Sequence, residues 1–547
     1  MEIFQIVLLF IVFLSIAVLM FLRKLPALLA LPIMAFLFPI ISGVSLNTTV
    51  QNVLGLGATK LSEAYTIAIF GSMLSVLLQK TGIAESFIKI GAELSGDKPW
   101  TIAVIMLLLI TLLFTTLGGL GAIIMVASVV LPIMASVGIG PLTTVGIFLI
   151  GLSLGGTLNV GNWAVYTTVL GLSVSEVRTF ALIMFSITFV VSLVYITIML
   201  YKDGHDINFK SIIIKSLCFI GVMSFLYFGF NKLDPSIQNN ISSFFSAAFE
   251  LFKYVIGILL SLLFIVAIIR AIRGKNSNGI HWISYFTPMI PLFLILIYNM
   301  NFIAAFIIGL IYGFVSTYKK KSLNTFVRAI LEGGSVVMPA IALMLGIGML
   351  LLAVLGPPTA SVKEKIKLNE SGNTIYKVPS DFISREKGSN IIVKVDNKAK
   401  AAWLSDSTIA ISGKPYSNIS CELNNWPVLN LLKPLFTRIV PTNAIAYIII
   451  FMLMAPLALY RGPLNVWGMG FGMAAIFLAS GMPAGAIMGL LLSVGQIQGI
   501  SDPTNTQNVW LANEMRVDVQ KILWNTIPYT WIIALLGLIA AAFLFMK

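Results

Sequence analysis

A dense set of oxygen and amide groups interrupts an apolar stretch near the end of the sequence, where residues 499–510 read GISDPTNTQNVW. Pro503 lies within this segment and breaks a helix. A helix interrupted inside a membrane exposes carbonyl oxygens that suit a cation and N–H groups that suit an anion. The segment is therefore typical of half of a site for a small anion and an accompanying ion. Its polar candidates are Asp502, Thr504, Asn505 and Thr506.

Three further interruptions have a similar composition. They are TTLGGLG at 115–121, GGTLNVGN at 155–162 and YRGPLN at 460–465. In lipid, each unsatisfied backbone group costs several kcal/mol, so a broken helix persists only where it lines a protected cavity. We therefore predict that the four interruptions meet around one cavity near mid-membrane. The candidates that they add are Thr115, Thr116, Asn159, Asn162 and Arg461.

Simpler roles are open to the uncharged candidates. Asn159 and Asn162 are suited to capping helix ends, and Thr115 and Thr116 are suited to bonding back to the preceding helical turn. These residue types therefore leave two interpretations, a ligand site or local helix chemistry, and the sequence does not separate them.

Arg461 and Asp502 carry the only charges within the four interruptions. A charge between apolar segments is functional by default, because its presence costs at least a few kcal/mol. The alternative is a structural ion pair between the two. Gln496 and Gln498 lie two positions apart on the preceding helix, so we expect at most one of them to face the cavity.

The elements that must position these residues are membrane helices. The chain has 547 residues, of which 58% are hydrophobic and only 10% are charged, whereas a soluble protein carries about 25% charged residues. Apolar runs of about 18 or more residues recur from end to end, and each is long enough to cross a bilayer as a helix. We therefore expect an all-α polytopic protein of the cell membrane.

An internal repeat organises these helices. SLNTTVQNVLGLG at 45–57 matches SLNTFVRAILEGG at 322–334 with an offset of 277 residues. Next, 67–82 matches 341–356 with an offset of 274. The membrane crossings expected within these matches are 64–80 and 336–356.

A third match has an offset of 343 and pairs Gly156 with Gly499 and Asn162 with Asn505. The rise from 274 to 343 marks a net insertion of 69 residues in the second copy, within the only long polar tract of the chain. Stretches such as NIIVKV and STIAISG predict that this insertion is a small β-rich domain outside the membrane.

The predicted organisation has five parts. The first repeat is 1–201, with a re-entrant hairpin at 100–137 and an interrupted helix at 142–172. Two connecting transmembrane helices follow within 202–283, at 211–230 and 244–270. The rest comprises 284–356 as the first part of the second repeat, 357–437 as the insertion, and 438–547 as its second part, with a re-entrant hairpin at 442–480 and an interrupted helix at 483–512.

The two repeats are expected to have opposite orientations. Five crossings in the first repeat and two connecting helices, seven crossings in all, precede the second repeat. Because seven is odd, the second repeat begins on the opposite side of the membrane from the first. Such an arrangement is the inverted-repeat architecture of secondary transporters.

Basic loop residues gather on one face of this topology, which the positive-inside rule makes cytoplasmic. Both termini and the insertion are then outside the cell. The basic residues of that face are Arg23, Lys24, Lys80, Lys89, Lys98, Lys202, Lys210, Arg270, Arg273, Lys275, Lys319, Lys320 and Lys321.

Several functional classes are disfavoured by the composition. The net charge of +14 follows from the basic loops, so we expect no nucleic-acid partner. Two histidines and two cysteines supply neither a metal pattern nor a hydrolase triad, so we expect no cofactor, no metal beyond Na⁺, and no enzyme. No GxxxxGK[ST] motif is present, so any pumping must draw on an ion gradient.

The SDPTN motif in an interrupted helix, preceded by a hairpin with a polar tip, resembles the ion transporter superfamily of gluconate, citrate, lactate, dicarboxylate and arsenite permeases. The resemblance covers about 440 residues, which are both repeats without the insertion and the connecting helices. In sodium-coupled members, Ser-Asn-Thr-like motifs hold the cation and a substrate carboxylate. No literal Ser-Asn-Thr occurs at these breaks, which leaves the coupling ion open.

The resemblance implies a division of roles between the candidates. Arg461 presents a fork to a carboxylate and is always charged, whereas Asp502 can ligate a cation or carry a proton. Substrate binding is assigned to Arg461, Thr115, Thr116, Asn162, Asn505 and Thr506. Binding of the coupling ion is assigned to Asp502, Asn159 and Thr504.

The expected function is therefore a secondary active transporter for a small organic anion, coupled to Na⁺ or H⁺. A cation/proton antiporter is the alternative, because it needs Asp502 but has little use for Arg461. The expected partners are the anion, the coupling ion and the lipid bilayer. The sequence does not decide between symport and antiport, and it does not identify the anion or the role of the insertion. The oligomeric state is also open, with a homodimer as one option.

The predicted orientation is tested by thiol labelling of whole cells. A membrane-impermeant maleimide should label Cys421, which lies in the insertion, and should spare a cysteine that replaces Lys320. A Cys218→Ser variant supplies the background, because Cys218 lies in an apolar run. Labelling at position 320 with none at exposed positions of the insertion would reverse the orientation.

Overall fold

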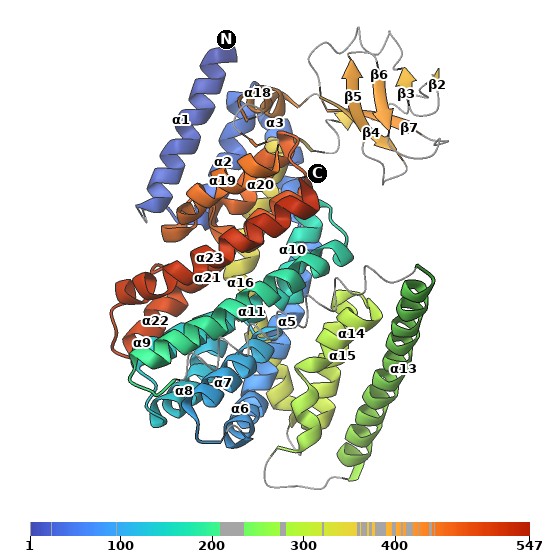
Figure 1. The fold of residues 1–547 in the computed structure, drawn as a ribbon. Helices are drawn as coiled ribbons and strands as arrows, with labels where there is room; N and C mark the ends of the chain where they lie inside the picture. The colour runs from blue at the N-terminus through green and yellow to red at the C-terminus, as the bar shows by residue number, and fades with distance from the viewer. Residues whose placement is uncertain are drawn as a thin grey trace.

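The chain forms a bundle of long and interrupted helices with a group of strands at one end (Figure 1). A computed structural model describes residues 2–22, 24–94, 96–207, 235–273, 280–319, 322–357, 426–436, 440–441 and 443–546, together with strands between 361 and 424. Among these residues, eight helical segments are long and apolar enough to cross a membrane. The prediction of an all-α polytopic membrane protein is confirmed at this level.

The first half of the chain consists of helices, several of them in pairs. A short break separates α9 from α10, and a tight turn separates α7 from α8. The elements are α1 (Glu2–Phe21), α2 (Ala27–Ile41), α3 (Leu46–Thr48), the π-helix η1 (Thr49–Gly55), α4 (Leu56–Thr59), α5 (Ser62–Lys80), α6 (Ile83–Leu94), α7 (Pro99–Phe114), α8 (Leu120–Ser136), α9 (Pro141–Leu158), α10 (Val160–Leu170) and α11 (Val174–Lys202).

The second half has a similar order of elements. A break again separates two consecutive helices, α21 and α22. The elements are α14 (Met289–Tyr298), α15 (Phe302–Ser316), α16 (Ser322–Leu355), α18 (Pro427–Phe436), α19 (Ala444–Met454), η4 (Ala455–Arg461), η5 (Val466–Gly470), α20 (Phe471–Ala479), α21 (Ala484–Ser501), α22 (Thr506–Glu514) and α23 (Val519–Phe545).

Between the halves lie α13 (Pro235–Arg273) and the short η2 (Trp282–Phe286). The connecting helix expected at 244–270 falls within α13, and the one expected at 211–230 lies outside the described residues.

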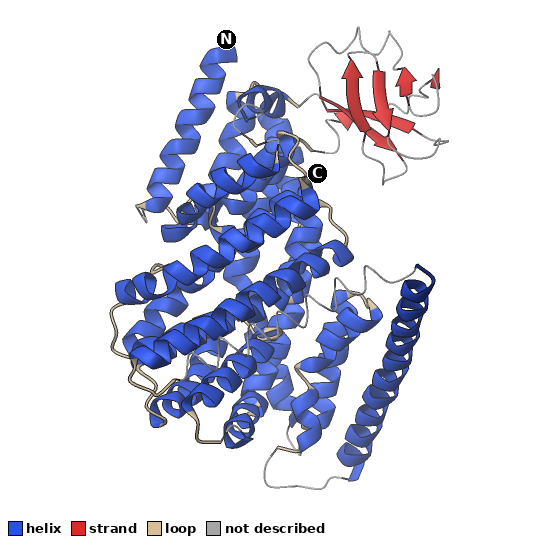
Figure 2. Cartoon of the chain, in the orientation of Figure 1, coloured by secondary structure: helices blue, strands red, loops and turns tan. Residues whose placement is uncertain are grey.

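The insertion contains antiparallel strands in two sheets, with strand orders β1-β7-β4 and β2-β3-β6-β5. These strands gather beyond the end of α16, apart from the helices (Figure 2). Their bounds are β1 (Ser361–Val362), β2 (Asn369–Glu370), β3 (Ile375–Lys377), β4 (Asn390–Val395), β5 (Ala401–Ser405), β6 (Thr408–Ile411) and β7 (Ile419–Asn424).

Two of the membrane helices are longer than the sequence indicated. The crossings expected at 64–80 and 336–356 begin much earlier, within helical segments Leu46–Lys80 and Ser322–Leu355. Both segments begin at the repeated SLNT motif, and the hydroxyl of Ser45 caps the first of them by accepting from the Thr48 N–H at 3.2 Å. Polar residues in the first turns made these helix starts look like loops.

The change in repeat offset has a structural cause. Because the offset falls from 277 to 274, the first copy holds three more residues between the two matched segments. These residues lie between 57 and 67, where α4 ends and the chain turns at Lys60 and Leu61 before α5.

The two helices that begin with SLNT pack against each other in antiparallel directions. A Cβ atom added to Gly57 would lie 2.5 Å from Cα of Met349, and one added to Gly333 would lie 2.5 Å from Cα of Met73. Residue numbers therefore rise along one helix as they fall along the other. Glycine is required at both crossings because the neighbouring backbone occupies the place of a side chain.

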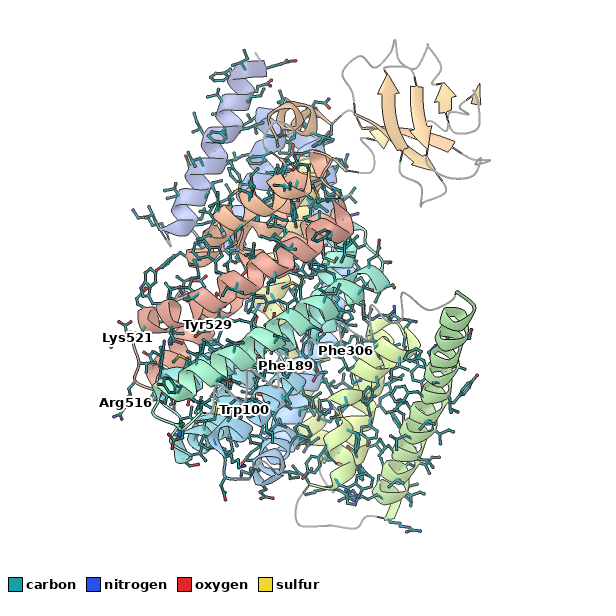
Figure 3. The ribbon with its side chains drawn as sticks, viewed as in Figure 1. Trp100, Phe189, Phe306, Arg516, Lys521 and Tyr529 are labelled. Carbon is teal, nitrogen blue, oxygen red and sulfur yellow. The ribbon has the colours of Figure 1, made fainter. Side chains whose placement is uncertain are left out.

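The helices α11 and α23, which follow the two breaks, also pack side by side (Figure 3). Tyr195 of α11 donates from its hydroxyl to Oδ1 of Asn525 at 2.7 Å. Its ring meets that of Tyr529 edge to face, with centroids 5.0 Å apart. Such aromatic pairs contribute about 0.5–1.5 kcal/mol beyond their burial. The C-terminal helices of the two halves are thereby held together.

Adjacent glycines on α16 allow a matched test of the helix crossing. We expect Gly333→Ala to destabilise the protein by about 1–3 kcal/mol, because the new Cβ atom meets the backbone of Met73. Gly334→Ala meets nothing within 4 Å and should leave stability unchanged or raise it slightly. Thermal unfolding of the detergent-purified protein measures both, and equal melting temperatures would contradict the close crossing.

Candidate functional site

A cavity of about 630 Å³ lies between the two halves of the chain. Its wall is formed by the turn between α7 and α8, the α9–α10 break, the middle of α16, the start of η5 and the α21–α22 break. The lining is mixed: aliphatic side chains and glycines form most of it, and amides and hydroxyls come mainly from the two breaks. Pockets of this kind fix a small ligand through a few well-placed polar groups.

The first break is stabilised by two asparagine amides. Asn159 separates α9 from α10 with extended backbone angles, φ −71° and ψ 114°. Its Oδ1 atom accepts from the Gly161 N–H at 2.9 Å, and its Nδ2 atom donates to the Phe114 carbonyl of α7 at 3.2 Å. Asn162 donates from Nδ2 to the carbonyl of Gly156 at 2.8 Å. The amides therefore satisfy backbone groups that the end of α9 leaves open.

The second break repeats this geometry with one change of residue. Asp502 stands 343 positions after Asn159 and has nearly the same backbone angles, φ −71° and ψ 112°. Its Oδ1 atom accepts from the N–H of Thr504 at 2.9 Å and from the Thr504 hydroxyl at 2.8 Å. Asn505 donates from Nδ2 to the carbonyl of Gln498 at 2.5 Å, as Asn162 does in the first break.

Asp502 cannot reproduce the second bond of Asn159, because an ionised carboxylate only accepts hydrogen bonds. Asn465 supplies the missing donor. Its Nδ2 atom donates to the carbonyl of Ala458 at 3.1 Å and lies 3.5 Å from Oδ2 of Asp502. Ala458 lies in the segment that corresponds to the end of α7, so the hairpin is tied to the break in both halves.

Equivalent positions of the two halves touch one another at the cavity. Ser153 and Gln496 are 343 residues apart, which is the repeat offset, and Oγ of Ser153 donates to Oε1 of Gln496 at 2.8 Å. Nε2 of Gln496 then donates to Oγ1 of Thr157 at 3.0 Å. Two equivalent residues can meet only at the approximate two-fold axis that relates the two halves. The cavity therefore lies at that axis.

The residues predicted from the sequence fall into four groups. Asn159, Asn162, Asn505 and Thr506 line the cavity. Asp502 and Thr504 lie behind the second break, where Asp502 is fully buried. The backbone of Arg461 ends η4, and its side chain lies outside the described residues. Thr115 and Thr116 donate to the carbonyls of Leu112 and Leu113 in their own helix and are not part of the cavity wall.

Two findings were missed or misjudged from the sequence. Gln496 and Gln498 both line the cavity, although at most one was expected to face it. The cavity wraps around the end of α21, so residues on more than one helix face reach it, and Oε1 of Gln498 also accepts from the Val466 N–H at 2.7 Å. Ser153 was not singled out, although the offset of 343 would have paired it with Gln496.

The electrostatic character of the site depends on Asp502. Within the described part of the chain, this buried carboxylate contacts only neutral donors, namely Thr504 and Asn465. A buried carboxylate without a cation is expensive, so such a group favours a bound cation or a proton. No group of three or more His, Cys, Asp or Glu side chains that would hold a metal ion occurs among the described residues.

Two transport proteins are among the solved structures to which the chain is similar. The chain is similar to the YdaH transporter of Alcanivorax borkumensis, with a TM-score of 0.48 and 11% identity, over 91% of this chain and 88% of that one. It is similar to MtrF of Neisseria gonorrhoeae, described among antimetabolite efflux pumps, with a TM-score of 0.42 and 12% identity, over 94% of each chain. No family model and no curated protein matches the sequence.

The resemblance to the ion transporter superfamily is corrected by these comparisons. The two structures named above are of transporters and not of enzymes, and the identification with gluconate-type or citrate-type permeases is wrong. The identification depended on SDPTN within an interrupted helix. Polar breaks of this kind serve any membrane protein that interrupts a helix around a ligand, so a five-residue motif does not specify a family.

The link through Asn465 can be tested by removing its amide. We expect Asn465→Ala to lower the free energy of unfolding by about 1–3 kcal/mol, because the Ala458 carbonyl and the Asp502 carboxylate lose a buried donor. Asn513→Ala, at an exposed position of α22, is the matched control and should have little effect. Thermal unfolding of both variants in detergent gives the comparison, and equal stabilities would rule out the link.

Proposed function

We propose that the chain is a secondary transporter that moves a small organic anion, a carboxylate, across the cell membrane in coupling with Na⁺ or H⁺. The observation that carries this proposal is the cavity between two equivalent helix breaks, with a buried carboxylate directly behind one of them. An interrupted helix is tolerated within a membrane where it lines such a cavity, and there it serves as a ligand site.

An inverted repeat supports the transport mechanism. The two SLNT helices run antiparallel, and the breaks that follow them share backbone angles and hydrogen-bond patterns. Two halves related in this way have two conformations of similar energy, in which the roles of the halves are exchanged. The cavity then opens to alternate sides of the membrane as one half moves against the other.

The N-terminus of α22 is the best-placed group for the anion. Asn505 precedes this helix, but its side chain makes no cap hydrogen bond, because its amide is turned to the Gln498 carbonyl. Thr506 and Gln507, in the first turn, line the cavity. Their N–H groups and the positive end of the helix dipole therefore suit a carboxylate.

Asp502 is the group that we assign to the coupling ion, together with Asn159 and Thr504. Its carboxylate lies behind the same break that presents the α22 N-terminus to the anion. A cation or proton bound there offsets the buried negative charge, which makes it easier for a second negative charge to enter the adjacent cavity. Occupancy of the two sites is then coupled through electrostatics.

Arg461 remains our assignment for the second anion contact, with Asn162 as a further contact. Thr115 and Thr116 are no longer assigned, because their hydroxyls bond within their own helix and they do not line the cavity. The backbone of Arg461 ends η4, in the hairpin that Asn465 ties to the second break, and arginine carries a permanent positive charge. A cation/proton antiporter is the alternative function, favoured by the burial of Asp502. It would need Asp502 and make no use of the α22 N-terminus or of Arg461.

Uptake into proteoliposomes distinguishes the two functions. A panel of labelled mono- and dicarboxylates would be offered with a Na⁺ gradient alone and with a pH gradient alone. We expect one carboxylate class to accumulate under one of the two gradients. Proton movement driven by Na⁺ in the absence of any carboxylate, with no carboxylate uptake, would favour the antiporter and reject anion transport.

Substitutions at Asp502 and Arg461 separate the two proposed roles. Asp502→Asn should keep exchange of labelled substrate and lose gradient-driven accumulation, because the amide cannot carry the coupling charge. Arg461→Gln should weaken or abolish anion binding and leave the ion site formed. Asp518→Asn, an exposed carboxylate that caps α23, is the matched control, because asparagine caps as well as aspartate does.

The two variants also test the structural alternative. If Asp502 and Arg461 form an ion pair that only supports the fold, either substitution strands a buried charge at a cost of about 3–5 kcal/mol, and both variants should misfold alike. Two well-folded variants with unchanged ion dependence of uptake would contradict both assignments.

A further inference from the structure

A second cavity, of about 320 Å³, lies at the N-terminal end of α16. It is enclosed by the ends of α5, α13 and α15, by the segment before η2, and by the first turn of α16. None of the residues discussed for the central cavity lines it. It is therefore a separate feature of the fold.

The wall of this second cavity is strongly basic. Lys80, Arg270 and Lys319 reach it from three different helices or helix ends, and His281 adds an imidazole. Lys80 is also bonded to Glu332 at 2.8 Å, which offsets part of its charge. No carboxylate lines the cavity among the described residues. Cations from separate elements repel one another, so their convergence favours a bound anion.

Neutral donors complete the wall. The Oγ atom of Ser322 is buried and has no hydrogen-bond partner among the described residues. Ser322 is also the first residue of α16, a helix of 34 residues, so the N–H groups of the first turn lie beside it. A buried hydroxyl without a partner is costly, and a ligand oxygen would relieve that cost.

His281 contributes a donor without adding a charge. Its Nδ1 atom accepts from the Ile283 N–H at 3.4 Å, so the neutral ring carries its proton on Nε2. Burial, and then the charge of Arg270, lower the pKa of His281 below its usual range. The neutral ring therefore offers its Nε2–H group as a donor to an anion in the cavity.

We propose that this basic cavity binds a phosphate group at the membrane surface. Three cationic side chains, a hydroxyl and a helix N-terminus match the several oxygen atoms of a phosphate better than a single carboxylate. The loop charges place the same residues on the face predicted to be cytoplasmic, where anionic phospholipids gather and basic pockets between helices take their head groups. A phospholipid head group and a soluble phosphate share this chemistry.

A phosphate bound here would contact three separate parts of the chain. Arg270 belongs to the connecting helix α13, Lys80 ends the long helix of the first half, and Ser322 begins its counterpart in the second half. The bound group would therefore brace α13 against both halves. Binding should stabilise the fold, because a ligand that binds only the folded state raises the melting temperature.

The experiment uses the full chain, purified in a neutral detergent and depleted of lipid. Thermal unfolding is followed during titration with dioleoyl phosphatidylglycerol, with dioleoyl phosphatidylcholine of the same chains, and with inorganic phosphate. We expect phosphatidylglycerol to raise the melting temperature more than phosphatidylcholine does. Arg270→Gln and Lys319→Gln should each weaken this binding about tenfold, since each removes a charged hydrogen-bond donor. Lys202→Gln, at an exposed lysine of α11 outside the cavity, is the matched control.

The outcomes are distinct. A shift with phosphatidylglycerol alone identifies a lipid head group, and an equal shift with inorganic phosphate identifies a soluble phosphate ligand. Either shift in melting temperature supports the proposal if it is lost in Arg270→Gln and Lys319→Gln and kept in Lys202→Gln. Absence of any shift with both probes, or an equal loss of binding in Lys202→Gln, would overturn it. These readouts do not involve transport, so they are independent of the proposed function.

Discussion

The fold depends on one constraint, which is that every backbone polar group inside a membrane must have a partner. Helices α9 and α21 end within the bundle, and their last carbonyls and the N–H groups that follow lack the partners that a continuous helix would supply. Asparagine amides meet this need because they both donate and accept. Asn159, Asn162 and Asn505 bond to backbone groups beside their own breaks. Asn159 also reaches across to the first hairpin, and Asn465 reaches from the second hairpin to Asp502. The bonds that make the interruptions tolerable therefore also fix the walls of the central cavity.

The two breaks differ in charge because of one residue, which is Asn159 in the first and Asp502 in the second. Asn159 satisfies the first break alone, whereas Asp502 accepts bonds and leaves donation to Asn465. The change from amide to carboxylate brings a buried negative charge and requires a second residue to support it. The bond from the side-chain oxygen to the N–H group two residues later is kept in both breaks. In the proposed function, the coupling-ion site therefore comes from the divergence of one position between two copies of one motif.

The sequence predicted where the helices break, but it did not predict which hydrogen bonds join these breaks to the rest of the fold. Repeat offsets and interrupted apolar runs located the four breaks, because glycine, proline and amides seldom gather within an apolar segment unless a helix is broken there. The partners of those amides were not predictable, since the carbonyls of Phe114 and Ala458 belong to segments distant in the sequence. The early starts of the SLNT helices were missed because tertiary packing, with glycines at the crossings, overrides polar composition. The family was misidentified because helix-breaking motifs report a physical need that many folds share.

The helix α16 links the basic cavity to the central cavity. It begins at the basic cavity with Ser322, crosses α5 at Gly333, and contributes Val336 and Pro339 to the wall of the central cavity. Pro339 has no N–H to donate, so the helix loses one internal hydrogen bond next to that wall. The segment before it is held to α5 by close backbone contact, and the segment after it meets the backbone of α4 at Gly348. Pro339 therefore lies between the two crossings and beside the cavity wall, at a turn of α16 whose internal hydrogen bonding is weakened while both crossings are tightly packed.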